Sequence, residues 1–544
     1  MRFNALLFSL TAALSLTGPA WAQNAASAGP VVDEVPLRAH LALLSSDLFE
    51  GRGTGQRGGE LTVAYLETQA KVLGLQPAAP GGSYRQAVRL LGTRTLQAQS
   101  QLRIDGDSKS GPMPVLKFGS DWVYGSGNAQ AINAFGEELV FAGYGISAPE
   151  ERWDDFKGLD LRGKVLIVLA NDPYPTEAEP GRFAGKAMTI YGRRAYKFEE
   201  ALRRGAKGVL VLHTEASTLS SWSVVSQGAL SEQFQLDGGK LGLPLQGWIS
   251  QPAAQQLFAS AGLDLDALRA QAESREFKPV PLGLRLQGEL HTELRRLEQF
   301  NIAGLVPGSD PKLKDELVIY TAHWDHIGKT TNASGETQIF NGAVDNASGT
   351  AALLAMAQAA ALQPARRSQM FLWVAAEEQG LLGSAWYTQQ PLWPLARTAA
   401  NLNLDTLNFV GRTRDIGAHG AERSDLGAVA AQVAEQMGLS IAPPRVDVGG
   451  YYFRSDHFSF AKAGVPAFSV SSGSQYHGDV AAQTAKRAAY GQRYHQSSDR
   501  YDPSWDLSGM REQAQYTLTL GRSIGNAEAM PAWKAGDPFG AVKR

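Results

Sequence analysis

Alternating apolar and mixed segments divide the second half of the chain into a regular series of strands and helices. Beyond Phe300, the apolar runs typical of buried strands are ELVIYTAH, QMFLWVAAEE, NLNLD and GVPAFSVSSG. Two segments with helical spacing lie between these runs, namely SGTAALLAMAQAAALQ and LLGSAWYTQQ. This alternation predicts an α/β fold, in which a mostly parallel or mixed sheet carries helices on both faces.

The first half of the chain has a different pattern. Near its start we expect a helix, a glycine-rich loop and a second helix from Gly59 to Leu73, which Gly74 ends. From about residue 102 to residue 290, strand-like runs such as ELVFAGYGI and GKVLIVLAND outnumber the helices. One helix in this region, within AYKFEEALRRG, precedes a predicted strand from Val209 to His213.

The N-terminus has the pattern of a secretory signal peptide. Arg2 precedes an apolar core, residues 5–16, and Ala20 and Ala22 form a small-residue cleavage site. The core is shorter than the ~20 residues that a membrane span needs. We therefore expect residues 1–22 to be removed near Ala22, and the mature protein to be exported, to the periplasm or beyond, without stable membrane insertion.

Charge and composition exclude several classes of function. The 544 residues carry a net charge of -2, and no block of Lys and Arg suits a nucleic acid, so we expect no nucleic-acid partner. The chain has no cysteine, which excludes disulfides, cysteine zinc sites and thiol catalysis. Any catalytic site must therefore use oxygen and imidazole groups.

Acidic residues and histidines recur where the predicted strands end. The candidates are His323, Asp325, Asp345, Glu377, Glu378, Asp405 and, farther along, His495. In open α/β sheets the carboxyl ends of the strands converge around a ligand, so these side chains are expected to meet. Carboxylates gathered without a cation repel one another, whereas imidazole and carboxylate together suit zinc or a similar divalent ion.

The number of candidates indicates a shared site. Five ligands are too many for one tetrahedral zinc, and a bridging carboxylate would let two ions share them. Of the adjacent Glu377 and Glu378, one can bind metal while the other moves protons. A metal-activated water with a neighbouring carboxylate base suits amide hydrolysis.

In this order, the motifs AHWDH, NGAVDNASG, AAEEQGLLGS, LNLD and YHQSSD resemble those of the co-catalytic di-zinc aminopeptidases, metallopeptidase family M28. The resemblance is to the subgroup with an inserted protease-associated domain, and it includes SSDLFEGRGTG near the start. It implies the zinc-exopeptidase fold, which is phosphorylase/hydrolase-like. Residues 31–101 and 291–530 would form the peptidase domain, and residues 102–290 a β-rich protease-associated domain that shapes access to the site.

The resemblance also implies a role for each position and two Zn²⁺ per chain. The ligands of one zinc would be His323, Asp345 and Asp405, and those of the other Asp345, Glu378 and His495. Asp345 would then be the bridge. The remaining roles are Glu377 as general base, Asp325 as the carboxylate that orients His323, Tyr494 as a hydrogen-bond donor to the oxyanion, and Arg454 in the substrate pocket.

Some features depart from the family's simplest pattern. His323 and Asp345 are 22 positions apart, which a surface loop can absorb, and Val344 stands where relatives often have aspartate. We expect His326 not to bind metal, and His457 and His477 to line the pocket or the surface. The glycines of FEGRGTGQRGG predict a tight turn and not a phosphate cradle, since no strand precedes them.

The sequence thus predicts an exported aminopeptidase that acts on peptides. A carboxypeptidase or dipeptidase of the same fold is the nearest alternative, and glutaminyl cyclase has a similar scaffold with a single zinc. A different class of function is a non-catalytic binding protein, because related domain pairs have lost activity. Such proteins typically lack the ligands or the base, which this chain retains.

Overall fold

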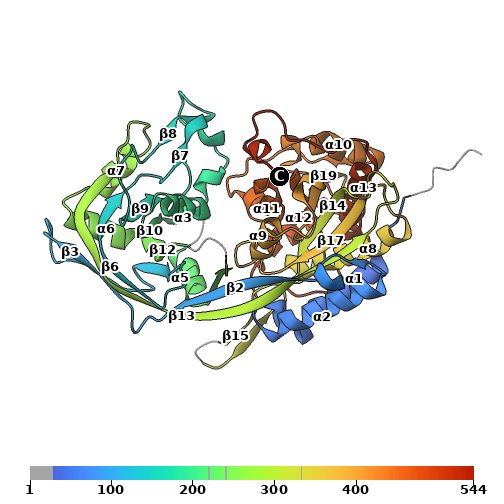
Figure 1. Cartoon of the computed structure of the whole chain (residues 1–544), viewed down its shortest axis with the longest axis horizontal. Helices are drawn as coiled ribbons and strands as arrows, with labels where there is room; N and C mark the ends of the chain where they lie inside the picture. Colours follow the sequence, from blue (N-terminus) through green and yellow to red (C-terminus); the bar gives the residue numbers. More distant parts are fainter. Residues whose placement is uncertain (1–28, 219–220, 239–241, 332–333) are drawn as a thin grey trace, which may run out of the picture.

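Two long strands join the two lobes of the chain. The computed structural model describes residues 29–218, 221–238, 242–331 and 334–544. Within them, β2 (Arg85–Thr95) and β13 (Val280–Val306) run side by side from one lobe to the other (Figure 1). The predicted signal peptide, residues 1–22, lies outside the described residues.

The larger lobe is built on a mixed sheet with four parallel strands. In spatial order these are β17 (Ser368–Val374), β14 (Leu317–His323), β18 (Thr398–Leu404) and β21 (Ala467–Ser472). The second half of β13 extends the sheet antiparallel to β17. Every residue of β14, β17 and β18 is buried, which explains why most of their residues are apolar.

Helices cover both faces of this sheet, as the sequence predicts. On one face the core includes side chains of α1 (Glu34–Leu44), α2 (Arg57–Val72), α8 (Ser348–Leu362), α10 (Leu426–Gln436) and α13 (Ser508–Asn526). On the other face it includes α9 (Leu382–Gln389) and α11 (His457–Lys462). Successive residues of β14 alternate between the two cores, as the pleat of a strand requires. The predicted α/β architecture is confirmed.

The smaller lobe has a sheet of its own. Its parallel strands are β6 (Ile132–Phe141), β9 (Val165–Leu169), β10 (Gly208–His213) and β12 (Leu245–Ser250). The first half of β13 pairs with β6 and with β3 (Gln101–Gly106), and β5 (Trp122–Gly125) pairs with β12. The expected boundary at residue 290 falls inside β13, because this one strand belongs to both sheets.

Helices of the smaller lobe pack on this second sheet, and shorter elements complete the fold. The helices are α3 (Arg194–Arg203), α6 (Gln251–Ser260) and α7 (Leu265–Gln271). The shorter elements are β1 (Gln76–Pro77), β4 (Val115–Leu116), β7 (Ser147–Ala148), β8 (Trp153–Asp154), α4 (Glu215–Thr218), α5 (Trp222–Leu230), β11 (Gln233–Leu236), β19 (Asp415–Gly417), β20 (Ser440–Ile441) and α12 (Val480–Tyr490).

The long segment between His323 and Asp345 contains paired strands where the sequence predicted only a surface loop. β15 (Gly328–Thr331) and β16 (Thr337–Phe340) pair antiparallel, and Gly328 lies opposite Phe340.

No helix in the described part of the chain has both the length and the apolar character to cross a bilayer.

Close packing of α13 on β14 generates a first prediction. A Cβ atom added to Gly521 would lie 2.1 Å from the hydroxyl oxygen of Tyr320, which is fully buried. Gly521→Ala should therefore lower the free energy of unfolding by about 1–3 kcal/mol, measured by denaturant unfolding. Gly228→Ala, in a helix with open space around it, is the control and should not destabilise. Equal free energies of unfolding for the two variants would contradict this packing of α13 on β14.

Candidate metal centre

The predicted site residues meet at one edge of the larger sheet. They are His323 at the end of β14, Asp345 before α8, Glu377 and Glu378 after β17, Asp405 after β18, and His495 after α12. The three strands are parallel neighbours, so their carboxyl ends lie together and the loops that follow can converge. The fold therefore brings together residues that are far apart in the sequence.

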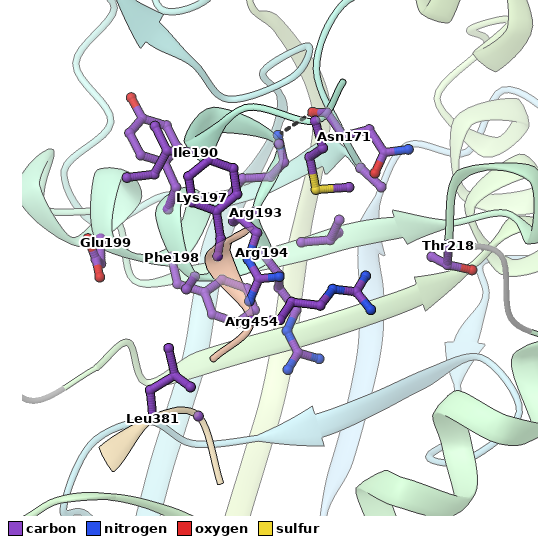
Figure 2. Close-up of a pocket in the computed structure, with 18 of the residues that line it drawn as sticks. Asn171, Ile190, Arg193, Arg194, Lys197, Phe198, Glu199, Thr218, Leu381 and Arg454 are labelled. Carbon is purple, nitrogen blue, oxygen red and sulfur yellow. Dashed lines mark hydrogen bonds between the residues drawn. The ribbon is translucent and has the colours of Figure 1, made fainter. Parts of the chain in front are cut away.

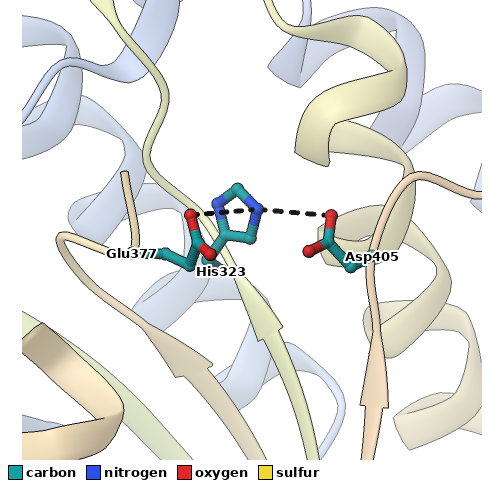
Figure 3. Close-up of side chains that lie close together, drawn as sticks. All are labelled: His323, Glu377 and Asp405. Carbon is teal, nitrogen blue, oxygen red and sulfur yellow. Dashed lines mark ion pairs between the residues drawn. The ribbon is translucent and has the colours of Figure 1, made fainter. Parts of the chain in front are cut away.

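His323 is the centre of a first group of potential ligand atoms. Its Nε2 atom lies 3.2 Å from Asp345 Oδ1 and 3.5 Å from Asp405 Oδ1. A third carboxylate oxygen, Oε2 of Glu377, is 3.9 Å away. Figure 3 shows the imidazole between the carboxylates of Glu377 and Asp405.

His495 is the centre of a second group. Its Nε2 atom is 3.1 Å from Asp345 Oδ2 and 3.1 Å from Glu378 Oε2. Asp345 thus presents one oxygen to each group, as a bridging ligand would. All five predicted ligands lie where two adjacent cations could share them.

The site contains more carboxylates than the neighbouring protein groups can neutralise. Burial raises the pKa of Glu377 well above its ordinary value, and the nearby carboxylate of Glu378 adds to this effect against the influence of His323. Burial disfavours the charged form of His495, yet Glu378 and Asp345 raise its pKa to about 10. The carboxylates therefore attract positive charge strongly.

Unpaired polar atoms support the same conclusion. Asp405 Oδ1, His326 Nε2 and His495 Nε2 are buried atoms that make no hydrogen bond of acceptable geometry among the described residues, although Asp405 Oδ1 and His495 Nε2 lie within ion-pair distance of the groups named above. Buried polar atoms are rarely left unpaired, and nitrogen and oxygen donors are the ones that zinc takes. The residues present thus fit a divalent metal.

Asp325 has a role that differs from the expected one. Its carboxylate is 3.9 Å from the Nδ1 atom of His323, whereas its backbone carbonyl lies only 3.1 Å from that atom. The carboxylate instead accepts the backbone N–H groups of Glu377, at 3.0 Å, and Glu378, at 3.4 Å. Asp325 thus orients His323 through its backbone and holds the two glutamates through its side chain.

Arg52, in the glycine-rich segment near the start, fastens that segment to the site. It is fully buried, and its guanidinium donates hydrogen bonds of 2.6–2.8 Å to the carbonyls of Leu44, Trp324, Asn341 and Gly342. Burial lowers its pKa to about 10 although nearby carboxylates oppose this, so it remains charged near neutral pH. The FEGRGTG segment therefore has a structural role at the site.

Two residues near the ligands were missed or given too little weight at the sequence level. His326, which we did not expect at the metal, is fully buried, and its Nδ1 atom lies 2.6 Å from Glu378 Oε1. Asp499 accepts the backbone N–H groups of Val344, at 3.2 Å, and Asp345, at 3.1 Å. Their motifs, AHWDH and YHQSSD, were the available signal, because each residue lies within four positions of a ligand.

The other predicted positions lie around the site. The ring of Tyr494 stacks on that of His495 with centroids 3.9 Å apart, and the side chain is about half exposed. Arg454 lines a cavity beside the site. His457 is buried against Tyr452, burial lowers its pKa to about 3, and His477 is exposed.

Comparison with known proteins identifies a family for the larger lobe. The sequence model of peptidase family M28 matches residues 301–519. Leupeptin-inactivating enzyme 1 of Streptomyces exfoliatus is 31% identical over 211 residues, which are 37% of this chain and 43% of that protein. The chain therefore matches less than half the length of this relative.

Solved structures resemble the chain at low identity. An aminopeptidase from Aneurinibacillus sp. strain AM-1 is 18% identical with a TM-score of 0.49, and the match covers 92% of this chain and 95% of that one. A zinc aminopeptidase from Bacillus subtilis is 17% identical with a TM-score of 0.42, covering 94% and 99%.

Fold and site together define a mixed α/β domain that gathers carboxylates and imidazoles around two points at the ends of its parallel strands. Residues 301–519, which include all of these side chains, match the sequence model of peptidase family M28. The resemblance of the motifs to family M28 is confirmed, and the inserted protease-associated domain stays a prediction.

The buried position of Arg52 generates a second prediction. Arg52→Met removes the donors of four buried carbonyls and a cation near the carboxylates, so the free energy of unfolding should fall by about 3–5 kcal/mol. Arg57→Met is the control, because this side chain is 65% exposed in its ion pair with Glu50. Denaturant unfolding measures both, and an unchanged midpoint for Arg52→Met would contradict the role of Arg52.

Proposed function

We propose that this chain is an exported zinc aminopeptidase that removes N-terminal residues from peptides. The observation that carries the proposal is the pair of donor groups that share Asp345, with Glu377 left over beside them. The M28 domain formed by residues 301–519 supports a peptidase.

Two Zn²⁺ ions are the proposed cofactors. His323, Asp345 and Asp405 would hold one, and Asp345, Glu378 and His495 the other. When bound, zinc is a Lewis acid that polarises the scissile carbonyl, promotes ionisation of water and offsets the carboxylate charge. Asp325, His326 and Asp499 keep the ligands or their backbone in place through the hydrogen bonds described above.

Glu377 is the proposed general base. Neither donor set needs it, and its side chain is 11% exposed, with Oε2 pointing toward the first group. Its raised pKa makes the Glu377 carboxylate a stronger base, which can accept a proton from the attacking water and then pass it to the leaving amine. Because Asp325 accepts the N–H groups of both glutamates, the base is held at a fixed distance from its neighbour Glu378.

Tyr494 is the proposed donor to the developing oxyanion. Loss of water around its hydroxyl, together with the negative charges of the site, raises the pKa of Tyr494, so the hydroxyl keeps its proton. A protonated phenol can donate a hydrogen bond to a carbonyl oxygen that gains charge in the transition state. The same excess of carboxylates would attract the protonated α-amine of a peptide substrate.

Export and the role of the smaller lobe complete the proposal. The pattern of residues 1–22 supports cleavage near Ala22 and a periplasmic or extracellular location. We assign the smaller lobe as the protease-associated domain, in keeping with its β-rich sequence, and propose that it shapes access to the site.

Hydrolysis of matched peptides tests the activity. A peptide with a free α-amine should lose its N-terminal residue first, and its N-acetylated form should not be cleaved. A chelator should abolish the reaction and added zinc should restore it, because the carboxylates then regain their cation. If the C-terminal residue is released first, the protein is a carboxypeptidase and not an aminopeptidase. If no peptide is cleaved in a metal-dependent reaction, a non-catalytic binding protein is favoured.

Removal of the proposed base tests the mechanism. Glu377→Gln should lower kcat by about 10²–10⁴-fold while the zinc content stays that of the wild type, because the residue moves protons and is not a required ligand. Glu60→Gln, at an exposed position of α2, is the matched control and should keep full activity. Full activity in Glu377→Gln would refute the assigned role.

A further inference from the structure

A cavity of about 1310 Å³ lies between the two lobes. Its walls include residues 170–175 and 192–199 of the smaller lobe and residues 379–381 of the larger lobe. Residues 379–381 directly follow Glu378, so the cavity reaches the edge of the candidate metal centre. Its size suits a peptide of a few residues.

Three arginines from the two lobes converge in this cavity. Arg193 and Arg194 stand at the start of α3, and Arg454 comes from the larger lobe; Figure 2 shows their side chains extending into the same space. Burial lowers the pKa of Arg193 to about 10, and the positive charges of Arg454 and Arg194 contribute to this effect. The negative charge of Glu377 opposes this lowering of the Arg193 pKa.

No ion pair within 4.0 Å joins these three cations to a carboxylate in the described part of the chain, and the negative charges of Glu377 and Asp447 act on Arg193 without such a contact. Of the acidic groups of the same wall, Glu199 pairs with Lys462 at 2.8 Å, and Asp172 accepts the backbone N–H of Thr189 through Oδ2, at 2.7 Å, while its Oδ1 has no hydrogen-bond partner among the described residues. Like charges brought together repel one another, so an anion in the cavity would stabilise this arrangement.

Aromatic rings hold two of the arginines and leave their hydrogen-bonding edges available. Arg194 lies over the ring of Tyr124, 4.6 Å from its centroid, and Arg454 lies over Tyr451 at 5.2 Å. A stacked guanidinium still presents N–H groups in its plane, and those groups match the two oxygens of a carboxylate. No side chain caps the N-terminus of α3, which begins at this cluster.

We propose that Arg193, Arg194 and Arg454 bind a carboxylate of the peptide substrate, so that the site selects peptides with a negative charge near the scissile bond. The proposal rests on the proposed peptidase function and adds a substrate class to it. The carboxylate could come from two sources, the C-terminus of a short peptide or an Asp or Glu side chain. Both present the same group to the arginines.

Kinetics with matched peptides test the proposal and distinguish the two sources. The substrates are a free-amine tripeptide with a C-terminal acid, the same tripeptide with a C-terminal amide, and an amide tripeptide in which Glu replaces a neutral residue. In the wild type, kcat/KM should be at least about tenfold higher for the acid, for the Glu peptide, or for both, than for the neutral amide. The charged peptide with the higher kcat/KM identifies the source of the carboxylate that the arginines bind.

The variant Arg193→Gln/Arg454→Gln should bring this preference to within about twofold of unity, since it removes two of the three donors. Arg103→Gln, an exposed arginine in β3 of the same lobe, is the control and should keep the wild-type preference. An equal loss for charged and neutral peptides would show a merely structural role, and either that result or an unchanged preference would overturn the proposal.

A binding measurement separates this proposal from the proposed activity. Calorimetry of Glu377→Gln protein with the acid and amide tripeptides should show tighter binding of the acid, and the arginine substitutions should remove the difference. If the wild type cleaves no peptide but this difference is seen, the carboxylate site stands and the peptidase function fails. If cleavage occurs without any discrimination in rate or binding, the peptidase stands and the carboxylate site fails.

Discussion

Repulsion among buried carboxylates is the constraint on which the functional part of this structure depends. Asp325, Asp345, Glu377, Glu378 and Asp405 lie at one edge of the larger sheet, and Asp345 approaches the imidazoles of both His323 and His495. The only fully buried arginine beside them in the described residues, Arg52, donates its hydrogen bonds to backbone carbonyls. Divalent cations bound between the carboxylate oxygens would remove this repulsion. The same bound cations would therefore stabilise the site and supply its chemistry.

The second constraint is the continuity of β13. This strand belongs to both sheets, so it fixes the smaller lobe against the larger one and creates the cavity between them. Arginines contributed by the two lobes therefore meet in this cavity. A peptide bound there would contact both lobes, which gives the smaller lobe a part in selecting the substrate.

Much of the larger lobe could be predicted because its local patterns and its packing agree. β14, β17 and β18 are buried on both faces and mostly apolar, and acidic residues or histidine stand at or just after their carboxyl ends. The candidate ligands followed from that pattern, and the resemblance to family M28 implied the role of each. By comparison, the contacts of Arg52 could not be predicted. Its partners are backbone carbonyls up to 290 positions away, and because every residue has such a carbonyl, the sequence does not identify them. The same holds for Asp325, whose carboxylate binds backbone N–H groups, and for the meeting of Arg193 with Arg454.

Zinc titration of the metal-free protein by calorimetry tests whether two metal positions share Asp345. Such sharing predicts about two zinc ions per chain for the wild type, loss of tight binding at both positions in Asp345→Ala, and loss at one position only in Asp405→Ala. Binding of two ions by Asp345→Ala, or of none by the wild type, would contradict it.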